Sequence, residues 1–180
     1  MRSNSIKDGN KSGNKNSNFT KIILMKAGIL GGGQLGRMLL QAAANYTVET
    51  YVLENDPHCP AAHLCHHFVL GDITNFDDVY AFGKKVDVLT IEIENVNIEA
   101  LEKLEAEGVT VIPKPSAIKI IKNKIKQKGF YQVNEIPTSD FVVTHTKENL
   151  VHHHTFLPAV HKLGEGGYDG KGVELITKQN

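Results

Sequence analysis

The stretch ILGGGQLGRML, residues 29–39, sets the fold of this 180-residue chain. A short apolar run ends at Leu30, three glycines follow, and apolar residues then recur at helical spacing. This pattern predicts a strand that turns through a glycine loop into a helix, and Gly31, Gly33 and Gly36 have the spacing of a dinucleotide-binding fingerprint. Glycines there let a phosphate approach the backbone N–H groups at the positive end of the helix. The motif by itself leaves open a second interpretation, a glycine turn that only packs the helix against the strand.

On both sides of this loop, strand and helix patterns alternate as far as Pro115. Strands are expected at Lys26–Leu30, Val48–Leu53, His67–Leu70, Val88–Glu92 and Val109–Ile112. Helices are expected at Gln34–Ala44, Pro60–Cys65, Phe76–Lys84 and Asn97–Glu107, the first with Leu35, Met38, Leu39 and Ala42 in the core. Strands separated by helices of about ten residues are typical of βαβ units. The predicted fold class is therefore α/β, a Rossmann-like parallel sheet with helices on both faces.

A different pattern follows Pro115. Ser116 is expected to cap one Lys-rich helix that ends near Gly129, and a new element is expected to begin at Phe141–Val143. Strands are expected at Leu157–His161 and Val173–Ile176. The predicted parts are thus a disordered tail at 1–24, which is too polar to offset its ordering entropy, a domain at 25–115, and a linker helix with an incomplete second domain at 116–180.

Composition excludes several kinds of function. Lys and Arg number 20 and so do Asp and Glu, so the formal net charge is zero and a nucleic-acid partner is not expected. No apolar run approaches the ~18 residues that a membrane helix needs, so no membrane partner is expected either. Two cysteines cannot build a disulfide framework, which favours a reducing, cytoplasmic location. Histidines and cysteines crowd residues 58–67, but they match the ligand spacing of a zinc site only loosely, and whether they bind metal stays open.

A second glycine-rich loop, GEGGYDGKG at residues 164–172, lies between the last two expected strands. Five of its nine residues are glycine, Lys162 precedes it and Lys171 lies within it. Such a loop can close over a triphosphate, and the two lysines can neutralise its charge. An ordinary hairpin needs only a glycine or two at its turn, so that interpretation explains less of the sequence.

The two loops in this order resemble the N5-carboxyaminoimidazole ribonucleotide synthetases, the ATPase subunits of phosphoribosylaminoimidazole carboxylase, in the ATP-grasp superfamily. The resemblance runs from about Met25 to the end of the chain. It rests on Ile29–Leu39, on Asp56-Pro57 with Pro60–Ala62, on Glu92–Val96, on Pro113–Ser116 and on Gly166–Gly172. It implies a pre-ATP-grasp domain followed by the start of an ATP-grasp domain.

The resemblance also implies a function, that of an ATP-dependent ligase in purine biosynthesis. ATP would phosphorylate bicarbonate, 5-aminoimidazole ribonucleotide would take up the carboxyl group, and Mg²⁺ would bridge the nucleotide phosphates. The ribonucleotide is expected at Gly33, Gln34, Leu35 and Glu92, with its phosphate at the helix N-terminus and its ribose hydroxyls on Glu92. The expected ATP-binding residues are Lys124, Lys162, Gly166, Gly167, Tyr168, Asp169, Gly170, Lys171 and Gly172. Lys124 stands where the family often has an arginine, and lysine loses the bidentate fork.

Family members continue past the equivalent of Asn180, into the part that carries the Mg²⁺ ligands. We therefore assign no catalytic residue, expect the metal ligands beyond Asn180, and expect no ligase activity from these 180 residues alone. A homodimer is possible by the same resemblance. Two alternatives stay open: a nicotinamide-dependent oxidoreductase domain that uses Gly31, Gly33, Gly36 and Glu54, and a non-catalytic nucleotide-binding remnant. The first leaves the loop at 164–172 unexplained.

Overall fold

The computed structural model describes residues 24–167 and 170–177. The predicted tail, except for Leu24, lies outside the described residues, and so do Tyr168 and Asp169. The larger part of the molecule is one parallel sheet in the order β3-β2-β1-β4-β5. Its strands are β1 (Met25–Leu30), β2 (Val48–Glu54), β3 (His67–Leu70), β4 (Val88–Ile91) and β5 (Thr110–Ile112). The predicted α/β class and parallel sheet are confirmed.

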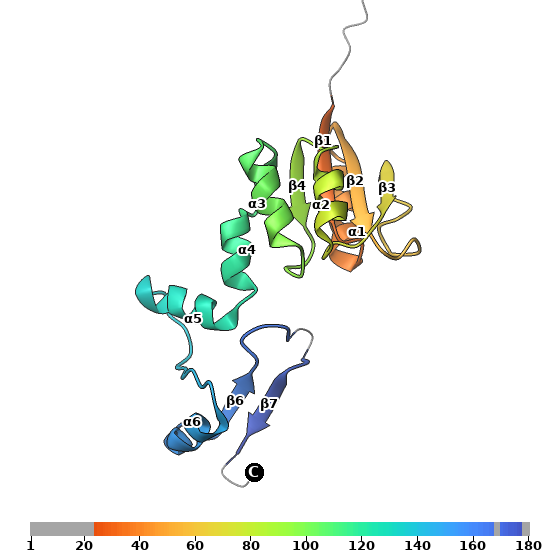
Figure 1. Ribbon diagram of the computed structural model, residues 1–180. Helices are drawn as coiled ribbons and strands as arrows, with labels where there is room; N and C mark the ends of the chain where they lie inside the picture. The colour runs from red at the N-terminus through yellow and green to blue at the C-terminus, as the bar shows by residue number, and fades with distance from the viewer. Residues whose placement is uncertain (1–23, 168–169, 178–180) are drawn as a thin grey trace, which may run out of the picture.

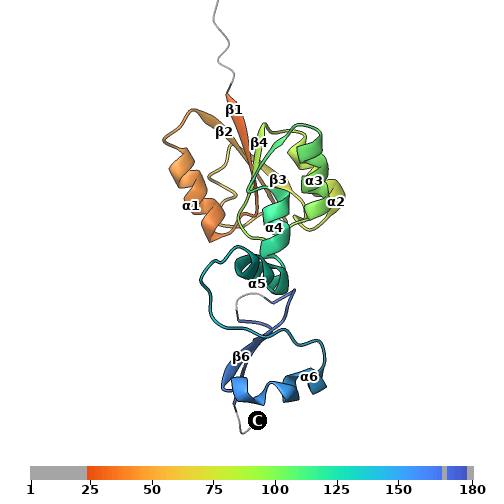
Figure 2. The same ribbon diagram turned by 90° about the vertical axis from the view of Figure 1, so that its left-hand side faces the viewer.

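Helices cover both faces of the sheet, because parallel strands need crossover connections (Figure 2). Helix α1 (Gln34–Ala43) lies on one face, and α2 (Phe76–Gly83) and α3 (Ile98–Ala106) lie on the other. Asn75 and Asn97 begin α2 and α3, and their side chains accept the N–H groups of Asp78 and Ala100.

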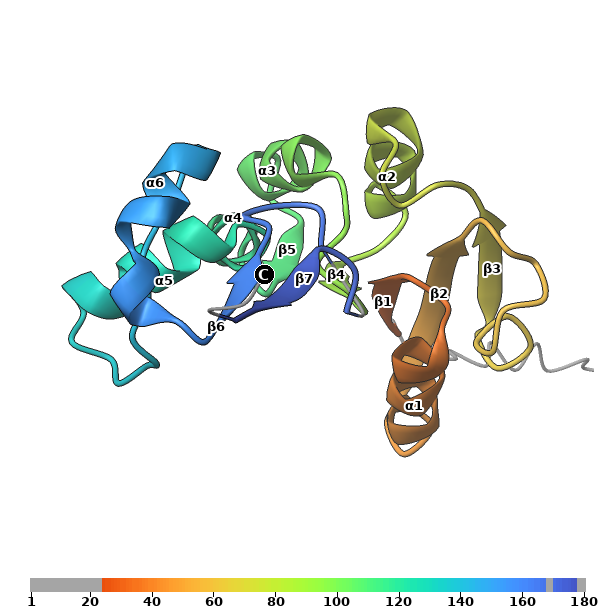
Figure 3. The same cartoon turned by 90° about the horizontal axis from the view of Figure 1, so that it is seen from below.

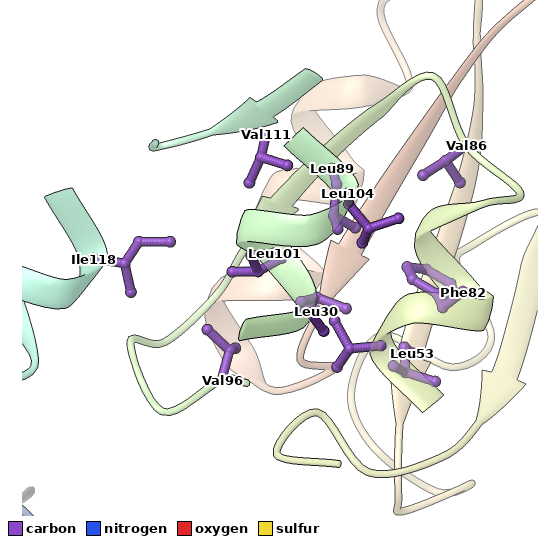
Figure 4. Packing of buried hydrophobic residues seen from close by; sticks show 12 residues of the cluster. Leu30, Leu53, Phe82, Val86, Leu89, Val96, Leu101, Leu104, Val111 and Ile118 are labelled. Atoms are coloured by element: carbon purple, nitrogen blue, oxygen red, sulfur yellow. The ribbon is translucent and has the colours of Figure 1, made fainter. Parts of the chain in front are cut away.

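The main hydrophobic core lies between the sheet and helices α2 and α3 (Figure 4). Leu30, Leu53 and Leu89 of the sheet are buried with Phe82 of α2 and Leu101 of α3. Full burial of one such side chain contributes about 1.5–3 kcal/mol. A smaller cluster under α1 contains Ile29, Leu40, Val52, Cys59 and Ala61.

The prediction for α1 is correct in extent but wrong in orientation. Leu35 and Met38 are 57% and 54% exposed, Leu39 and Ala42 are also exposed, and the buried residues are Gly36 and Leu40. A Cβ atom on Gly36 would lie 2.7 Å from the carbonyl oxygen of Gly31, so only glycine fits where the helix approaches the loop. This contact fixes the rotation of the helix, and the residue one turn later, Leu40, therefore faces the sheet.

The helix predicted at Pro60–Cys65 is absent, and the segment forms successive turns. The N–H groups of Ala62 and Leu64 donate to the carbonyls three residues earlier, those of Cys59 and Ala61. The N–H group of Ala61 instead donates to the carbonyl of Gly32, at 2.9 Å. A contact with the glycine loop thus replaces a helical bond and interrupts the helix.

The single Lys-rich helix predicted after Pro115 is two helices, α4 (Pro115–Ile121) and α5 (Lys124–Val133). Ser116 lies inside α4 and is not its cap, because Lys114 holds the N-cap position. Asn123 breaks the run: its backbone is extended, and its side chain accepts the N–H group of Lys126 to begin α5.

The remaining elements follow α5, below the sheet in the view of Figure 1. They are α6 (Lys147–His152), the 3₁₀ turn η1 (His154–Phe156), and the antiparallel strands β6 (Ala159–Lys162) and β7 (Val173–Ile176), which Figure 3 shows from another side. Phe141–Val143 belongs to no helix or strand. In the described part of the chain, every helix is too short or too polar to cross a membrane.

Candidate functional site

The glycine loop lies where the strand order of the sheet reverses. In the order β3-β2-β1-β4-β5, chain connections run in opposite directions on the two sides of the β1–β4 pair. The loop follows β1, and Glu92 directly follows β4. Ligands of open α/β sheets bind in the crevice at this switch point, next to the carboxyl ends of the strands. The topology therefore gives the predicted substrate residues a position suited to binding.

Glu92 is held against the glycine loop by two backbone N–H groups. Gly33 donates to its Oε2 at 2.7 Å, and Leu35 donates to its Oε1 at 3.1 Å. These are charge-assisted bonds at the positive end of α1, which favours a carboxylate. Of the predicted ribonucleotide residues, the structure thus brings Gly33, Leu35 and Glu92 into direct contact, and Gln34 lies between them as the first residue of α1.

Glycine at position 33 is required by this contact. A Cβ atom there would collide with Oε1 of Glu92, and its two next nearest neighbours would be other atoms of the same carboxylate. The carboxylate can approach the backbone only because no side chain intervenes. The fingerprint glycine therefore admits an acidic side chain of the protein itself.

Glu54 occupies the neighbouring N–H group. Gly32 donates to its Oε2 at 2.9 Å, and Asn55 donates to its Oε1 at 2.7 Å. The oxidoreductase alternative needs Glu54 for its cofactor, but here the carboxylate is bonded to the glycine loop and to the backbone of Asn55. A phosphate would have to displace carboxylates from Gly32, Gly33 and Leu35, and this disfavours both a dinucleotide and the phosphate position predicted at this helix N-terminus.

Cys59 supports the loop from behind. Its thiol is buried, and a side chain on Gly32 would collide with its Sγ atom. Burial raises the pKa of the Cys59 thiol and, likewise, the pKa of Cys65. Both sulfurs are therefore held as neutral thiols, unsuited to nucleophilic chemistry.

Two of the four histidines of the 58–67 segment, His66 and His67, have structural partners. His66 Nδ1 accepts the backbone N–H of Thr50 at 3.1 Å, and His67 pairs with Glu49 at 2.6 Å. Across residues 24–167 and 170–177, no three or more His, Cys, Asp or Glu side chains gather in a way that could hold a metal ion.

A second candidate site surrounds an open cavity of about 950 Å³ beside α5, β6 and the second glycine loop. Lys124, Lys162 and Gly164 line it together with apolar residues such as Phe141 and Leu157. The structure thus gathers two of the predicted ATP-binding lysines at one cavity. Cations and apolar surface in the same cavity suit a nucleotide, which carries phosphates and a planar base.

The second loop has a glycine-dependent backbone. Gly166, Gly170 and Gly172 have φ angles of 78°, 79° and 69°, a region that other residues rarely adopt. The Nζ of Lys124 donates to the carbonyl of Gly167 at 3.1 Å, so this lysine contacts the loop.

Three residues at these sites were missed or misread in the sequence. Glu54 was considered only for a dinucleotide. Asn123 and Glu165 were not singled out, yet the Nδ2 of Asn123 donates to the Oε1 of Glu165 at 2.6 Å. An Asn inside a Lys-rich run is a usable signal, because Asn favours N-caps over helix interiors. Nothing in the sequence indicates its distant partner.

Together, the parallel sheet, the loop at its switch point and the second glycine loop define a two-part α/β protein with two glycine-rich loops, an arrangement that suits nucleotide binding. Residues 24–122 match the family model of the ribonucleotide synthetase preATP-grasp domain. The chain belongs to this family.

Similar proteins carry the names that the resemblance suggested. The chain is 43% identical over 115 residues to a chloroplastic phosphoribosylaminoimidazole carboxylase of Vigna aconitifolia, covering 64% of this chain and 21% of that protein. It is 37% identical over 150 residues to the N5-carboxyaminoimidazole ribonucleotide synthase of Brucella melitensis, covering 81% and 40%.

A solved structure of N5-carboxyaminoimidazole synthase from Aspergillus clavatus, in complex with ADP and 5-aminoimidazole ribonucleotide, is also similar. Its TM-score is 0.75 at 32% identity, covering 87% of this chain and 41% of that one. The chain thus spans well under half the length of these relatives, and its likeness is to their N-terminal portion. The family expected from the two loops is confirmed.

Proposed function

We propose that the chain is the N-terminal part of an ATP-dependent carbon–nitrogen ligase that carboxylates 5-aminoimidazole ribonucleotide with bicarbonate, in purine biosynthesis. The γ-phosphoryl group of ATP moves to a bicarbonate oxygen, giving carboxyphosphate and ADP. The amino nitrogen of the ribonucleotide then attacks the carboxyl carbon and loses a proton, and the bond from that carbon to the phosphate oxygen breaks. The products are N5-carboxyaminoimidazole ribonucleotide, ADP and phosphate.

The observation that carries this proposal is the carboxylate of Glu92, fixed at the switch point by the N–H groups of Gly33 and Leu35. A carboxylate so fixed keeps lone pairs that can accept the hydroxyl groups of a ribose. In this proposal the ribonucleotide lies on Gly33, Gln34, Leu35 and Glu92, with ribose rather than phosphate nearest the loop.

ATP, in the same proposal, binds at the cavity beside the second loop. Lys124 and Lys162 line that cavity and supply positive charge for the phosphates. The glycines at 166, 167, 170 and 172 and Lys171 belong to the loop proposed to cover it, and Tyr168 and Asp169, also predicted to bind ATP, lie outside the described residues. The Mg²⁺ that the resemblance implies finds no ligand group among the described residues, and we assign it no step. Bicarbonate, a homodimer and a cytoplasmic location stay predictions.

Calorimetric titration of the chain with 5-aminoimidazole ribonucleotide tests the substrate part of the proposal. Glu92→Gln replaces a carboxylate oxygen with an NH₂ group that faces a backbone donor, so we expect binding to weaken by about tenfold or more. Glu94→Gln is the matched control, because the carboxylate of Glu94 takes no part in these bonds, and it is expected to bind like the wild type. Binding of NADH without binding of the ribonucleotide would instead support the oxidoreductase alternative, and binding of neither would favour the remnant.

A further inference from the structure

Two residues, Lys122 and Asn123, form the turn between α4 and α5, and together with Lys124, the first residue of α5, they contact both parts of the molecule. The Nζ of Lys122 donates to the carbonyl of Val96 at 3.1 Å. Val96 is buried in the core of the sheet domain, in the connection that follows Glu92. Asn123 and Lys124 contact the second glycine loop. The turn therefore lies between the two candidate sites and is bonded to both parts.

Three hydrogen bonds from Asn123 and Lys124 hold the near half of the second loop. The backbone N–H of Lys124 donates to the carbonyl of Gly164 at 2.7 Å, and its Nζ donates to the carbonyl of Gly167 at 3.1 Å. Between these two contacts, the Nδ2 of Asn123 donates to Oε1 of Glu165 at 2.6 Å. The last bond is the only one of the three that joins two side chains. It is therefore the only one whose donor and acceptor can be exchanged by substitution.

Packing supports the same attachment. A Cβ atom on Gly164 would lie 3.0 Å from Cδ1 of Ile125, so the loop backbone lies close against the first turn of α5. On the far side, the N–H of Leu163 donates to the carbonyl of Gly172 at 2.9 Å and closes the loop at its base. A glycine-rich loop has many accessible conformations, and restricting them before a ligand arrives lowers the entropy cost of binding.

We propose that Asn123 and Glu165 form a latch that positions the second glycine loop for nucleotide, with Asn123 acting as a positioning residue. Asn123 serves two purposes through separate atoms: Oδ1 caps α5 by accepting the N–H of Lys126, and Nδ2 holds Glu165. The latch ties the loop to α5, and through Lys122 to the sheet domain. This inference rests on the proposed function only for the identity of the ligand.

Reciprocal substitution tests the latch. Asn123→Asp keeps an oxygen that caps α5, removes the Nδ2 donor and places two carboxylates together, so the latch opens. Glu165→Gln keeps an acceptor oxygen for Nδ2. The double variant Asn123→Asp with Glu165→Gln restores the bond with donor and acceptor exchanged. Asn134→Asp, the same substitution at the other end of α5, is the matched control.

The readout is amide hydrogen exchange of the 180-residue chain, which needs no ligand. In Asn123→Asp we expect exchange at Lys124 and Leu163 to accelerate by about threefold to tenfold, the range for loss of one hydrogen bond. Exchange at Ile29 in the sheet stays unchanged, and the double variant returns to within about twofold of wild type. Wild-type exchange in Asn123→Asp, or no recovery in the double variant, would overturn the latch.

A second measurement, the affinity of each variant for ADP, separates this inference from the proposed function. Weakened ADP binding in Asn123→Asp that recovers in the double variant supports the latch as a device for nucleotide. Altered exchange with no ADP binding by any variant keeps the latch and rejects its nucleotide role. ADP binding that is equal in all variants, with equal exchange, rejects the latch and leaves the proposed ATP site standing.

Discussion

The side chains of Tyr80, Lys84 and Glu107 connect helix α2 to the end of α3; Tyr80 is partly buried against the main core, and Lys84 and Glu107 are exposed. The hydroxyl of Tyr80 and the Nζ of Lys84 both donate to the Glu107 carboxylate, at 2.8 and 3.0 Å. Lys84 first, and then Tyr80, lower the pKa of Glu107, while the bond to Glu107 raises the pKa of Lys84 and of Tyr80. The network therefore changes charge at acidic pH, where Glu107 is protonated, and at alkaline pH, where Tyr80 and Lys84 lose their protons.

The sign of each effect follows from these directions. A carboxylate with a lowered pKa stabilises the folded state above its ordinary pKa of 4.5, and that contribution is lost as the pH falls through the lowered value. Tyr80 and Lys84, whose pKa values are raised, stabilise the folded state below their ordinary pKa values of 10.0 and 10.5. That stabilisation is lost as the pH rises through the raised values. The network therefore stabilises the folded state throughout the neutral pH range.

Lys84→Met is expected to raise the pKa of Glu107 toward 4.5, because it removes the principal cause of the lowering. Carbon-detected NMR titration of the Glu107 carboxyl measures this directly. Lys85→Met removes the same charge from the next position, with no bond to Glu107 in the structure, and serves as the control. Equal titration curves in both variants would show that the Lys84 bond does not govern the carboxyl.

Helices α2 and α3 pack tightly against each other at a glycine. A Cβ atom on Gly83, the last residue of α2, would collide with the side chain of Leu104, which is fully buried in α3. By contrast, a Cβ atom on Gly129 of α5 meets nothing within 4 Å. Gly83 is thus required by packing, and Gly129 is not.

Gly83→Ala is expected to lower the free energy of unfolding by about 1–3 kcal/mol, the usual cost of overpacking a filled core. Gly129→Ala is expected to stabilise α5 by about 0.5–1 kcal/mol, because alanine loses less conformational freedom in a helix. Urea unfolding followed by circular dichroism measures both. If Gly83→Ala were as stable as Gly129→Ala, the close contact between α2 and α3 would be wrong.

Helix α4 belongs to the sheet domain by its packing. Ile118 of α4 is fully buried and joins the main core, and Lys119 pairs with Glu102 of α3 at 3.0 Å. The boundary predicted at 115–116 stays a prediction, but these contacts favour a boundary after α4. The family model also extends to residue 122.

Fragments 24–115 and 24–122 distinguish the two boundaries. Loss of α4 removes Ile118 and leaves a cavity, which for a large aliphatic side chain costs about 2–5 kcal/mol. We therefore expect 24–122 to unfold cooperatively in urea, and 24–115 to unfold at a clearly lower urea concentration. Equal midpoints would instead place the boundary before α4.

Local pattern predicted the elements, and contacts between distant residues decided the rest. Alternating periodicities gave the five strands and three of the helices within a residue or two, and Glu92 was expected at the end of β4, where it lies. The orientation of α1 depends on Gly36 meeting the carbonyl of Gly31, and the turns at 60–65 depend on Ala61 meeting Gly32. Helix α1 has apolar residues on two faces, and the sequence alone does not show which face is buried. The contact of Gly36 with Gly31 decides it.

The candidate site shows the same division. The fingerprint identified where backbone N–H groups would gather, since three glycines in a strand–helix turn have few other uses. What occupies those groups depends on two acids, Glu54 and Glu92, that lie 22 and 59 residues from their partners Gly32 and Gly33. Spacing along the chain carries no information about contacts of that range.

The fit of Glu92 against Gly33 also links the fates of these two positions in evolution. While Glu92 is present, a methyl group at position 33 meets its carboxylate, so alanine there is selected against. Once position 92 carries a small side chain, that obstacle disappears and position 33 is free to drift. A glutamate restored at position 92 would then have to hold its carboxylate away from the N–H group of residue 33. A substitution of Glu92 therefore becomes harder to reverse once position 33 has gained a side chain.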